Sequence, residues 1–191
     1  MVYRQEEAPQ FLPPDLADAA EVASLAYYPA LNPNAPFLGV TDDIEVAPNL
    51  AACMNNRRTV VSAAYADGKI GGKMIGFDLA VPIGVFDPRR REPDIAYLYF
   101  TAVHPDHRGQ GLVWGIHHDL FERLREQGYT KVEVDVVVGN TYADRFQAWS
   151  GAEVLGPDLD KYGFGPERPL RVDLDQFFAR PKDLLPTGVY S

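Results

Sequence analysis

A glycine-bearing turn near the middle of the chain has the residue types and the order of a phosphate-binding site. Arg108, Gly109 and Gly111 follow an apolar run and lead into an amphipathic segment that opens with Leu112. Glycine has no Cβ, so a ligand can approach the backbone closely there. The first amides of a helix have no intrahelical partners and lie at the positive end of its dipole. Such a turn can bind a pyrophosphate without a basic side chain.

The turn does not match the two best-known phosphate loops. It has neither the glycine-lysine-serine/threonine ending of a nucleotide P-loop nor the G-x-G-x-x-G of a dinucleotide fold. Two glycines alone are also compatible with a plain strand-to-helix turn. The residues around the turn therefore decide between a phosphate site and a plain turn.

The turn resembles the signature of the GNAT N-acetyltransferase superfamily, Q/R-x-x-G-x-G/A. Arg108 and Gly111 match its first two fixed positions, and the Val-x-Pro-x-x-Arg-Gly-x-Gly run matches the family's usual lead-in. Val113 stands where glycine or alanine is usual, and its branched side chain narrows the space beside a phosphate. This departure bears on coenzyme affinity more than on the fold.

A second resemblance follows the next predicted strand. Family members often have an asparagine there, an alanine three positions later, then a tyrosine, and then glycine-phenylalanine. Asn140, Ala143 and Gly151 match this pattern, whereas Gln147 replaces the tyrosine and Ala152 replaces the phenylalanine. The tyrosine is often the acid for the departing thiolate. Glutamine cannot donate that proton, so the proton would come from solvent.

The resemblance covers residues 95–155 and implies acetyl-CoA or another acyl-CoA as co-substrate, with no metal. In this family the strand before the turn splays from the next strand and binds the pantetheine arm through its backbone, and the turn binds the pyrophosphate. The implied coenzyme contacts are Phe100, Thr101, Ala102, Val103, Arg108, Gly109, Gln110, Gly111, Leu112, Val113, Asn140, Ala143 and Gln147.

Tyr97 and Tyr99 are the candidate catalytic residues, because they stand where the family often has a glutamate or histidine base. Alternation along a strand places both side chains on one face, together with Thr101. Tyrosine has a reference pKa of ~10 and is a poor base at neutral pH. We therefore expect these phenols either to orient a water that relays the amine proton or to line the pocket.

These residues require a strand, a helix and a second strand in direct succession. Hydrophobic periodicity, glycine and proline define the elements. The predicted helices are 16–28, 42–55 with Pro48 interrupting it, 111–127 and 140–150, and the predicted strands are 59–66, 73–83, 95–103, 131–138 and 169–174. The stripe expected to be buried on the third helix is Val113, Ile116, Leu120 and Leu124.

The order of elements predicts an α/β fold with a parallel strand–helix–strand crossover at its centre. With the resemblance, we expect a single GNAT-like domain over residues 1–191, with a mixed, mostly antiparallel sheet, a splayed central strand pair and flanking helices. Residues 1–58 would supply the helices and loops on the acceptor side, 59–174 the sheet core with the coenzyme A site, and 175–191 a C-terminal tail.

Composition narrows the partners and the compartment. The formal net charge of -9 repels a nucleic-acid backbone, so we expect no nucleic-acid partner. No apolar run approaches the ~18 residues of a membrane helix, and the start of the chain lacks the basic and apolar regions of a signal peptide. A cytoplasmic protein without membrane association is expected. The charge also suits a cationic amine, although many proteins are acidic for solubility alone.

Metal and disulfide chemistry find little support. Cys53 is the only cysteine, which excludes an intrachain disulfide and a cysteine-based metal site. No third ligand at a suitable spacing accompanies the histidines, so no zinc is expected. The histidines are His104, His107, His117 and His118. The basic run 89–91 is typical of a solvated loop, with contact to the coenzyme's 3′-phosphate as the alternative.

The resemblance implies an N-acyltransferase that moves an acyl group, most simply acetyl, from acyl-CoA to a primary amine of a small molecule or peptide. The amine would attack directly in a ternary complex. A degenerate member that binds acyl-CoA as a non-catalytic sensor or interaction module is the alternative, because of Val113, Gln147 and the missing acidic base. Transfer of longer acyl chains and homodimerisation, which is frequent in the family, stay open.

Overall fold

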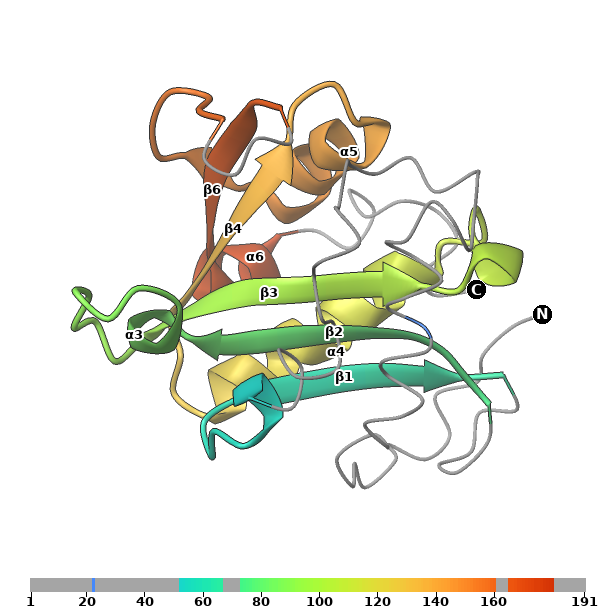
Figure 1. The fold of residues 1–191 in the computed structure, drawn as a ribbon, viewed down its shortest axis with the longest axis horizontal. Helices are drawn as coiled ribbons and strands as arrows, with labels where there is room; N and C mark the ends of the chain where they lie inside the picture. The colour runs from blue at the N-terminus through green and yellow to red at the C-terminus, as the bar shows by residue number, and fades with distance from the viewer. Residues whose placement is uncertain (1–21, 23–51, 67–72, 161–164, 181–191) are drawn as a thin grey trace.

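The computed structural model describes residues 22, 52–66, 73–160 and 165–180. Within them one six-stranded sheet has the strand order β1-β2-β3-β4-β6-β5 (Figure 1). The strands are β1 Val60–Tyr65, β2 Met74–Pro82, β3 Ile95–Val103, β4 Lys131–Val137, β5 Glu153–Val154 and β6 Glu167–Asp173. The predicted helices 16–28 and, apart from its last residues, 42–55 lie outside the described residues.

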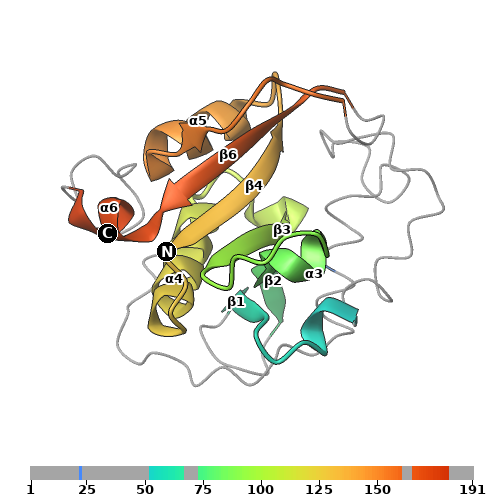
Figure 2. The ribbon, with the colours of Figure 1, turned by 90° about the vertical axis from the view of Figure 1, so that its left-hand side faces the viewer.

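Helices cover both faces of this sheet (Figure 2). The long helix α4 crosses β1, β2 and β3 on one face and packs against α5, which covers β4 and β6, whereas the short α3 lies on the other face. The helices are α3 Ile83–Phe86, the 3₁₀ turn η1 Pro105–His107, α4 Leu112–Glu126, α5 Thr141–Ser150 and α6 Leu174–Ala179. The predicted α/β class and the flanking helices are confirmed.

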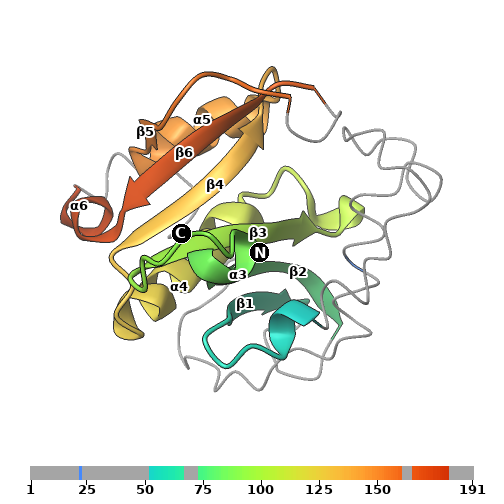
Figure 3. The same cartoon turned by 60° about the vertical axis from the view of Figure 1, so that its left-hand side comes forward.

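The centre of the sheet is a parallel pair that separates along its length. β3 pairs with β4 in parallel only at Ile95↔Lys131, Ala96↔Val132 and Tyr97↔Glu133, while every other strand pair is antiparallel. Beyond Tyr97 the two strands diverge (Figures 1 and 3). The predicted crossover, the mostly antiparallel pairing and the splayed central pair are therefore confirmed.

Helix α4 buries a wider face than its sequence predicted. Ile116, Leu120 and Leu124 are buried as expected, but Val113 is only partly buried. Its neighbour Trp114 is buried instead, because α4 contacts the sheet on one side and α5 on the other. A helix with two packing partners needs an apolar stripe broader than the usual one.

The end of the described chain differs from the predicted tail. Residues 174–179 form helix α6. Asp173 caps its start, because the side chain of Asp173 accepts a hydrogen bond from Gln176 N at 2.9 Å. Phe177 then packs edge-on against Trp149, with 4.9 Å between ring centroids. Two aromatic rings buried together fix this segment on the core. The short strand β5 was also not predicted.

Candidate active site

The divergence of β3 and β4 opens a V in the middle of the sheet. β3 keeps its pairing with β2 as far as Val103, but its other edge pairs with β4 only through Tyr97. Among the described residues, β3 has no pairing with β4 from Phe100 to Val103, and its edge there faces the V. A strand edge can bind an extended ligand through main-chain hydrogen bonds.

The glycine turn lies at the open end of the V. Gly109 and Gly111 have backbone φ angles of 73° and 77°, which residues with a Cβ rarely adopt. Gly111 is the N-cap of α4, and no side chain caps the helix there. A Cβ built on Gly109 would meet no heavy atom within 4 Å. The start of α4 thus has no side-chain cap and follows a turn with open space at Gly109, an arrangement that fits the pyrophosphate of coenzyme A.

Arg108 braces this turn against the strand. Its Nε donates to the carbonyl of Val103 at 3.2 Å, which ties the loop across the end of β3. The preceding His104 caps η1 by accepting from Asp106 N at 3.3 Å. The turn is therefore held by its own side chains.

The three residues predicted on α5 have different surroundings. The side-chain oxygen of Asn140 accepts from Tyr142 N at 3.0 Å and starts the helix. Ala143 is 4% exposed and packs in the hydrophobic core. The side-chain oxygen of Gln147 accepts from Arg168 on β6 at 3.4 Å.

A β-bulge changes the expected alternation along β3. Leu79 pairs with Phe100 and Ala80 pairs with Leu98, so Tyr99 is an extra residue between them. A bulge reverses the faces of the residues that follow it.

The side chains show the reversal. Tyr97, Tyr99 and Phe100 share the hydrophobic cluster on the α3 face, whereas Thr101 hydrogen-bonds Asp78 on the α4 face. The prediction that Thr101 faces the same side as the two tyrosines was wrong. That Tyr97 and Tyr99 share a face is confirmed.

Tyr97 lies at the apex of the V and meets a carboxylate that the sequence did not single out. Its hydroxyl donates to Asp135 Oδ2 at 3.0 Å, and Phe86 of α3 stacks on its ring at 3.5 Å between centroids and 8° between planes. Both residues line a cavity of about 230 Å³ between α3, β3, β4 and β6. Burial first, and then the nearby Cys53, raises the pKa of Tyr99, so this phenol stays protonated at neutral pH and is not available as a base.

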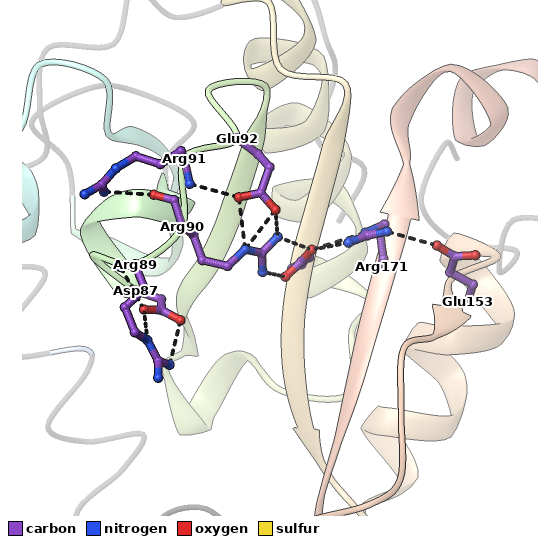
Figure 4. Close-up of polar contacts among 8 residues, drawn as sticks. Asp87, Arg89, Arg90, Arg91, Glu92, Glu153 and Arg171 are labelled. Carbon is purple, nitrogen blue, oxygen red and sulfur yellow. Dashed lines mark hydrogen bonds and ion pairs between the residues drawn. The ribbon is translucent and has the colours of Figure 1, made fainter.

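Two arginines of the basic run, Arg89 and Arg90, are paired with carboxylates, and Arg90 lines this cavity (Figure 4). Arg90 donates to Glu133 at 2.8 Å and to Glu92 at 2.7 Å, and Arg171 of β6 donates to Glu133 at 2.7 Å. Burial acts to raise the pKa of Glu133, but the hydrogen bonds from the two arginines outweigh it and the pKa is lowered. The hydrogen bond from Arg90 lowers the pKa of Glu92 to about 2.

The same run lies far from the glycine turn. Residues 89–91 follow α3 at the start of β3, and the turn follows the end of β3 (Figure 1). Arg89 is paired with Asp87 at 2.8 Å, and Arg91 donates to the carbonyl of Pro88. This placement disfavours contact with a 3′-phosphate and favours a structural role beside the cavity.

A family model described as "Acetyltransferase (GNAT) family" matches residues 24–148, more than half of the chain. The chain belongs to the GNAT acetyltransferase family. GNAT proteins are acyl-CoA-dependent enzymes that acetylate amines with acetyl-CoA. A search of curated proteins gave no match.

Solved GNAT structures share the fold of this chain. The ribosomal-protein-S18-alanine N-acetyltransferase of Escherichia coli superposes with a TM-score of 0.60 at 17% identity, over 84% of this chain and 88% of its own. A GNAT-family acetyltransferase of Desulfovibrio desulfuricans gives 0.62 at 16%, over 87% and 97%. The PaiA N-acetyltransferase of Thermoplasma acidophilum, solved with coenzyme A, gives 0.56 at 14%, over 83% and 92%.

Other classes of site find no counterpart in the described residues. No group of three or more His, Cys, Asp or Glu side chains gathers there as a metal ion would require. In the part of the chain that the structure describes, no helix has the length and apolarity needed to span a membrane.

Two sets of polar residues in this GNAT domain were missed by sequence reasoning. Glu133 and Asp135 alternate on a strand that is otherwise apolar after Lys131, a pattern that could have drawn attention to them. Asp78 and His117 are fully buried and hydrogen-bonded to each other, although 39 residues separate them. No local pattern predicts a pair at that separation.

Proposed function

We propose that this GNAT enzyme transfers an acyl group, most simply acetyl, from acyl-CoA to the primary amine of a small molecule or peptide. The observation that carries the proposal is the arrangement around the V. Its open end has the uncapped helix start at Gly111, and its apex has Tyr97 and Asp135 on a cavity. A thioester lying along the V would extend from the first to the second.

The coenzyme half of the site depends on backbone groups. The amides at 109–113 and the start of α4 suit the pyrophosphate, and the edge of β3 from Phe100 to Val103 suits the pantetheine arm. A backbone N–H at the splay would also stabilise the oxyanion that forms when the carbonyl is attacked. Such a donor is worth roughly 3–4 kcal/mol.

The acceptor half needs a proton acceptor for the amine. In our proposal the Asp135 carboxylate takes the proton that the amine nitrogen loses, and Tyr97 positions that carboxylate through its 3.0 Å hydrogen bond. The nitrogen attacks the thioester carbon, the C–N bond forms and the C–S bond breaks. Coenzyme A leaves as a thiolate that takes a proton from solvent. Tyr99 then lines the pocket.

Free-thiol release from acetyl-CoA with a panel of primary amines tests the proposal. We expect wild-type protein to release thiol with at least one small or peptide amine, and Gly111→Glu to lose coenzyme A binding at least 100-fold in calorimetry. Gly128→Glu is the matched control. Gly128 also has a positive φ, 86°, but it follows the other end of α4.

Two results would contradict the proposal. Unchanged coenzyme A affinity in Gly111→Glu would show that the glycine turn is not the pyrophosphate site. Tight coenzyme binding without thiol release for any amine would instead favour the non-catalytic sensor.

A further inference from the structure

Three polar side chains form a connected line in the core between α4, α5 and the sheet, and the proposed transfer uses none of them. Asp78 of β2 and His117 of α4 are both 0% exposed. His117 Nδ1 is hydrogen-bonded to Asp78 Oδ2, and His117 Nε2 to the hydroxyl of Tyr142 on α5 at 2.6 Å. We call these residues the Asp78–His117–Tyr142 line. Burying a polar group is costly unless it is hydrogen-bonded, so the hydrogen bonds of the line constrain how its elements pack.

Polar groups of β3 and α4 surround Asp78. Burial raises the pKa of Asp78, while His117 and Thr101 of β3 act in the opposite direction and Asp119 adds to the rise. Asp119 is itself held by Ser62 at 2.6 Å and Arg123 at 2.8 Å. His117 thus has one partner at each ring nitrogen, Asp78 at Nδ1 and Tyr142 at Nε2.

Tyr142 joins the starts of two helices. It lies in the first turn of α5, where its N–H is capped by Asn140. Its ring stacks on Trp114 in the first turn of α4, with 5.8 Å between centroids and 13° between planes. Trp114 N donates to Gly111 O at 3.0 Å, directly at the glycine turn. The phenol of Tyr142 therefore connects the glycine turn to the start of α5.

We propose that His117 is a positioning residue for coenzyme A, which it serves by holding Tyr142 and the start of α5 at a fixed distance from the start of α4. The inference rests on the proposed function, because it takes the coenzyme to lie between these two helix starts. When the start of α5 is already fixed in place, binding of the coenzyme does not have to supply the free energy of ordering it. Tyr97 and Asp135 line the cavity beside α3, so the line acts on binding and not on turnover.

The variant Tyr142→Phe tests this with the smallest change. It keeps the ring that stacks on Trp114 and removes only the hydroxyl that His117 holds. Ser150→Ala is the matched control, because Ser150 is a buried residue of the same helix whose hydroxyl donates to Phe146 O at 2.7 Å. Both variants delete one hydrogen-bonded hydroxyl from α5, and only one of them breaks the line.

We expect Tyr142→Phe to weaken coenzyme A binding in calorimetry about tenfold, which corresponds to ~1.4 kcal/mol. Its kcat at saturating acetyl-CoA should stay within about twofold of wild type, and Ser150→Ala should change neither quantity more than about twofold. His117→Leu should lower the affinity for coenzyme A at least as much, and thermal denaturation shows whether this variant is folded. If His117→Leu does not fold, the test depends on Tyr142→Phe alone.

Equal coenzyme affinity of Tyr142→Phe and wild type would overturn the inference, as would a loss in kcat with unchanged affinity. These outcomes differ from a failure of the proposed function. In that case wild-type protein itself does not bind coenzyme A, or Gly111→Glu binds it as well as wild type does.

Discussion

The hydroxyl of Tyr97 is the one group that distinguishes this side chain from phenylalanine, and it is the group that meets Asp135. The sequence indicated Tyr97 as a candidate site residue from its place on β3, but it did not identify Asp135 on β4 as its partner. The pairing depends on how β3 and β4 diverge, which only the three-dimensional arrangement determines. Tyr99 was placed on the correct face, and burial of its phenol argues for a lining role.

We predict that Asp135→Asn lowers kcat by about 10²–10⁴, the size expected when general-base assistance is lost. Tyr97→Phe should lower kcat by a smaller factor, roughly tenfold, because the carboxylate remains but loses the hydrogen bond that positions it. Tyr99→Phe should change mainly the apparent acceptor affinity. Steady-state kinetics with saturating acetyl-CoA measures all three. Near-normal kcat in Asp135→Asn would place the base elsewhere.

At the scale of the elements, sequence patterns located β3, α4 and α5 to within about one residue. Proline before β3 and glycines at both ends of α4 are local signals, so their effect can be predicted without the fold. The bulge at Tyr99 was missed because it arises from pairing with β2, and the nearly continuous apolar run around it carries no local signal of a bulge. Helix α6 was missed because its stability comes from Phe177 against Trp149.

The ion pairs around Glu133 join the loop after α3 to β4 and β6, and they predict a pH dependence. The pKa of Glu133 is lowered in the folded protein, so its contribution to stability is present above the unfolded pKa of about 4.3. That contribution is lost as pH falls through the lower, folded pKa.

We therefore predict that Glu133→Gln destabilises the protein at neutral pH by roughly 2–4 kcal/mol, since two arginines lose their common partner. The difference between variant and wild type should shrink below about pH 4. Urea denaturation between about pH 3 and 7 measures it. Glu122→Gln makes the same charge change on the exposed side of α4 and should show little effect. An equal loss in both variants would contradict the prediction.

For the whole molecule, the net charge of -9 acts differently on the two proposed substrates. It attracts a cationic amine and repels the anionic coenzyme, and dissolved salt screens both effects. The sequence alone predicted this sign, because charge can be counted without a fold. Which amine our proposed acceptor cavity would select could not be predicted, because its walls come from four separate elements.

We predict that raising ionic strength from about 0.02 to 0.3 M increases the apparent KM of a cationic acceptor several-fold while kcat stays constant. The KM of acetyl-CoA should stay level or fall over the same range. An uncharged osmolyte at matched osmolarity is the control. A rise in both KM values would show that local contacts, and not the overall field, dominate association.

The three residue pairs that join β3 to β4 are the sole parallel rungs between two half-sheets, β1-β2-β3 and β4-β6-β5, in the described chain. Tyr97 lies on the last rung, so backbone pairing sets its place beside Asp135. Beyond this rung the half-sheets are joined by side chains, because Trp114 of α4 packs against Tyr142 and Trp149 of α5. The width of the apex is thus set by the main chain and the width of the open end by the packing of two helices, so substitutions in the helix contact should reach the coenzyme end first.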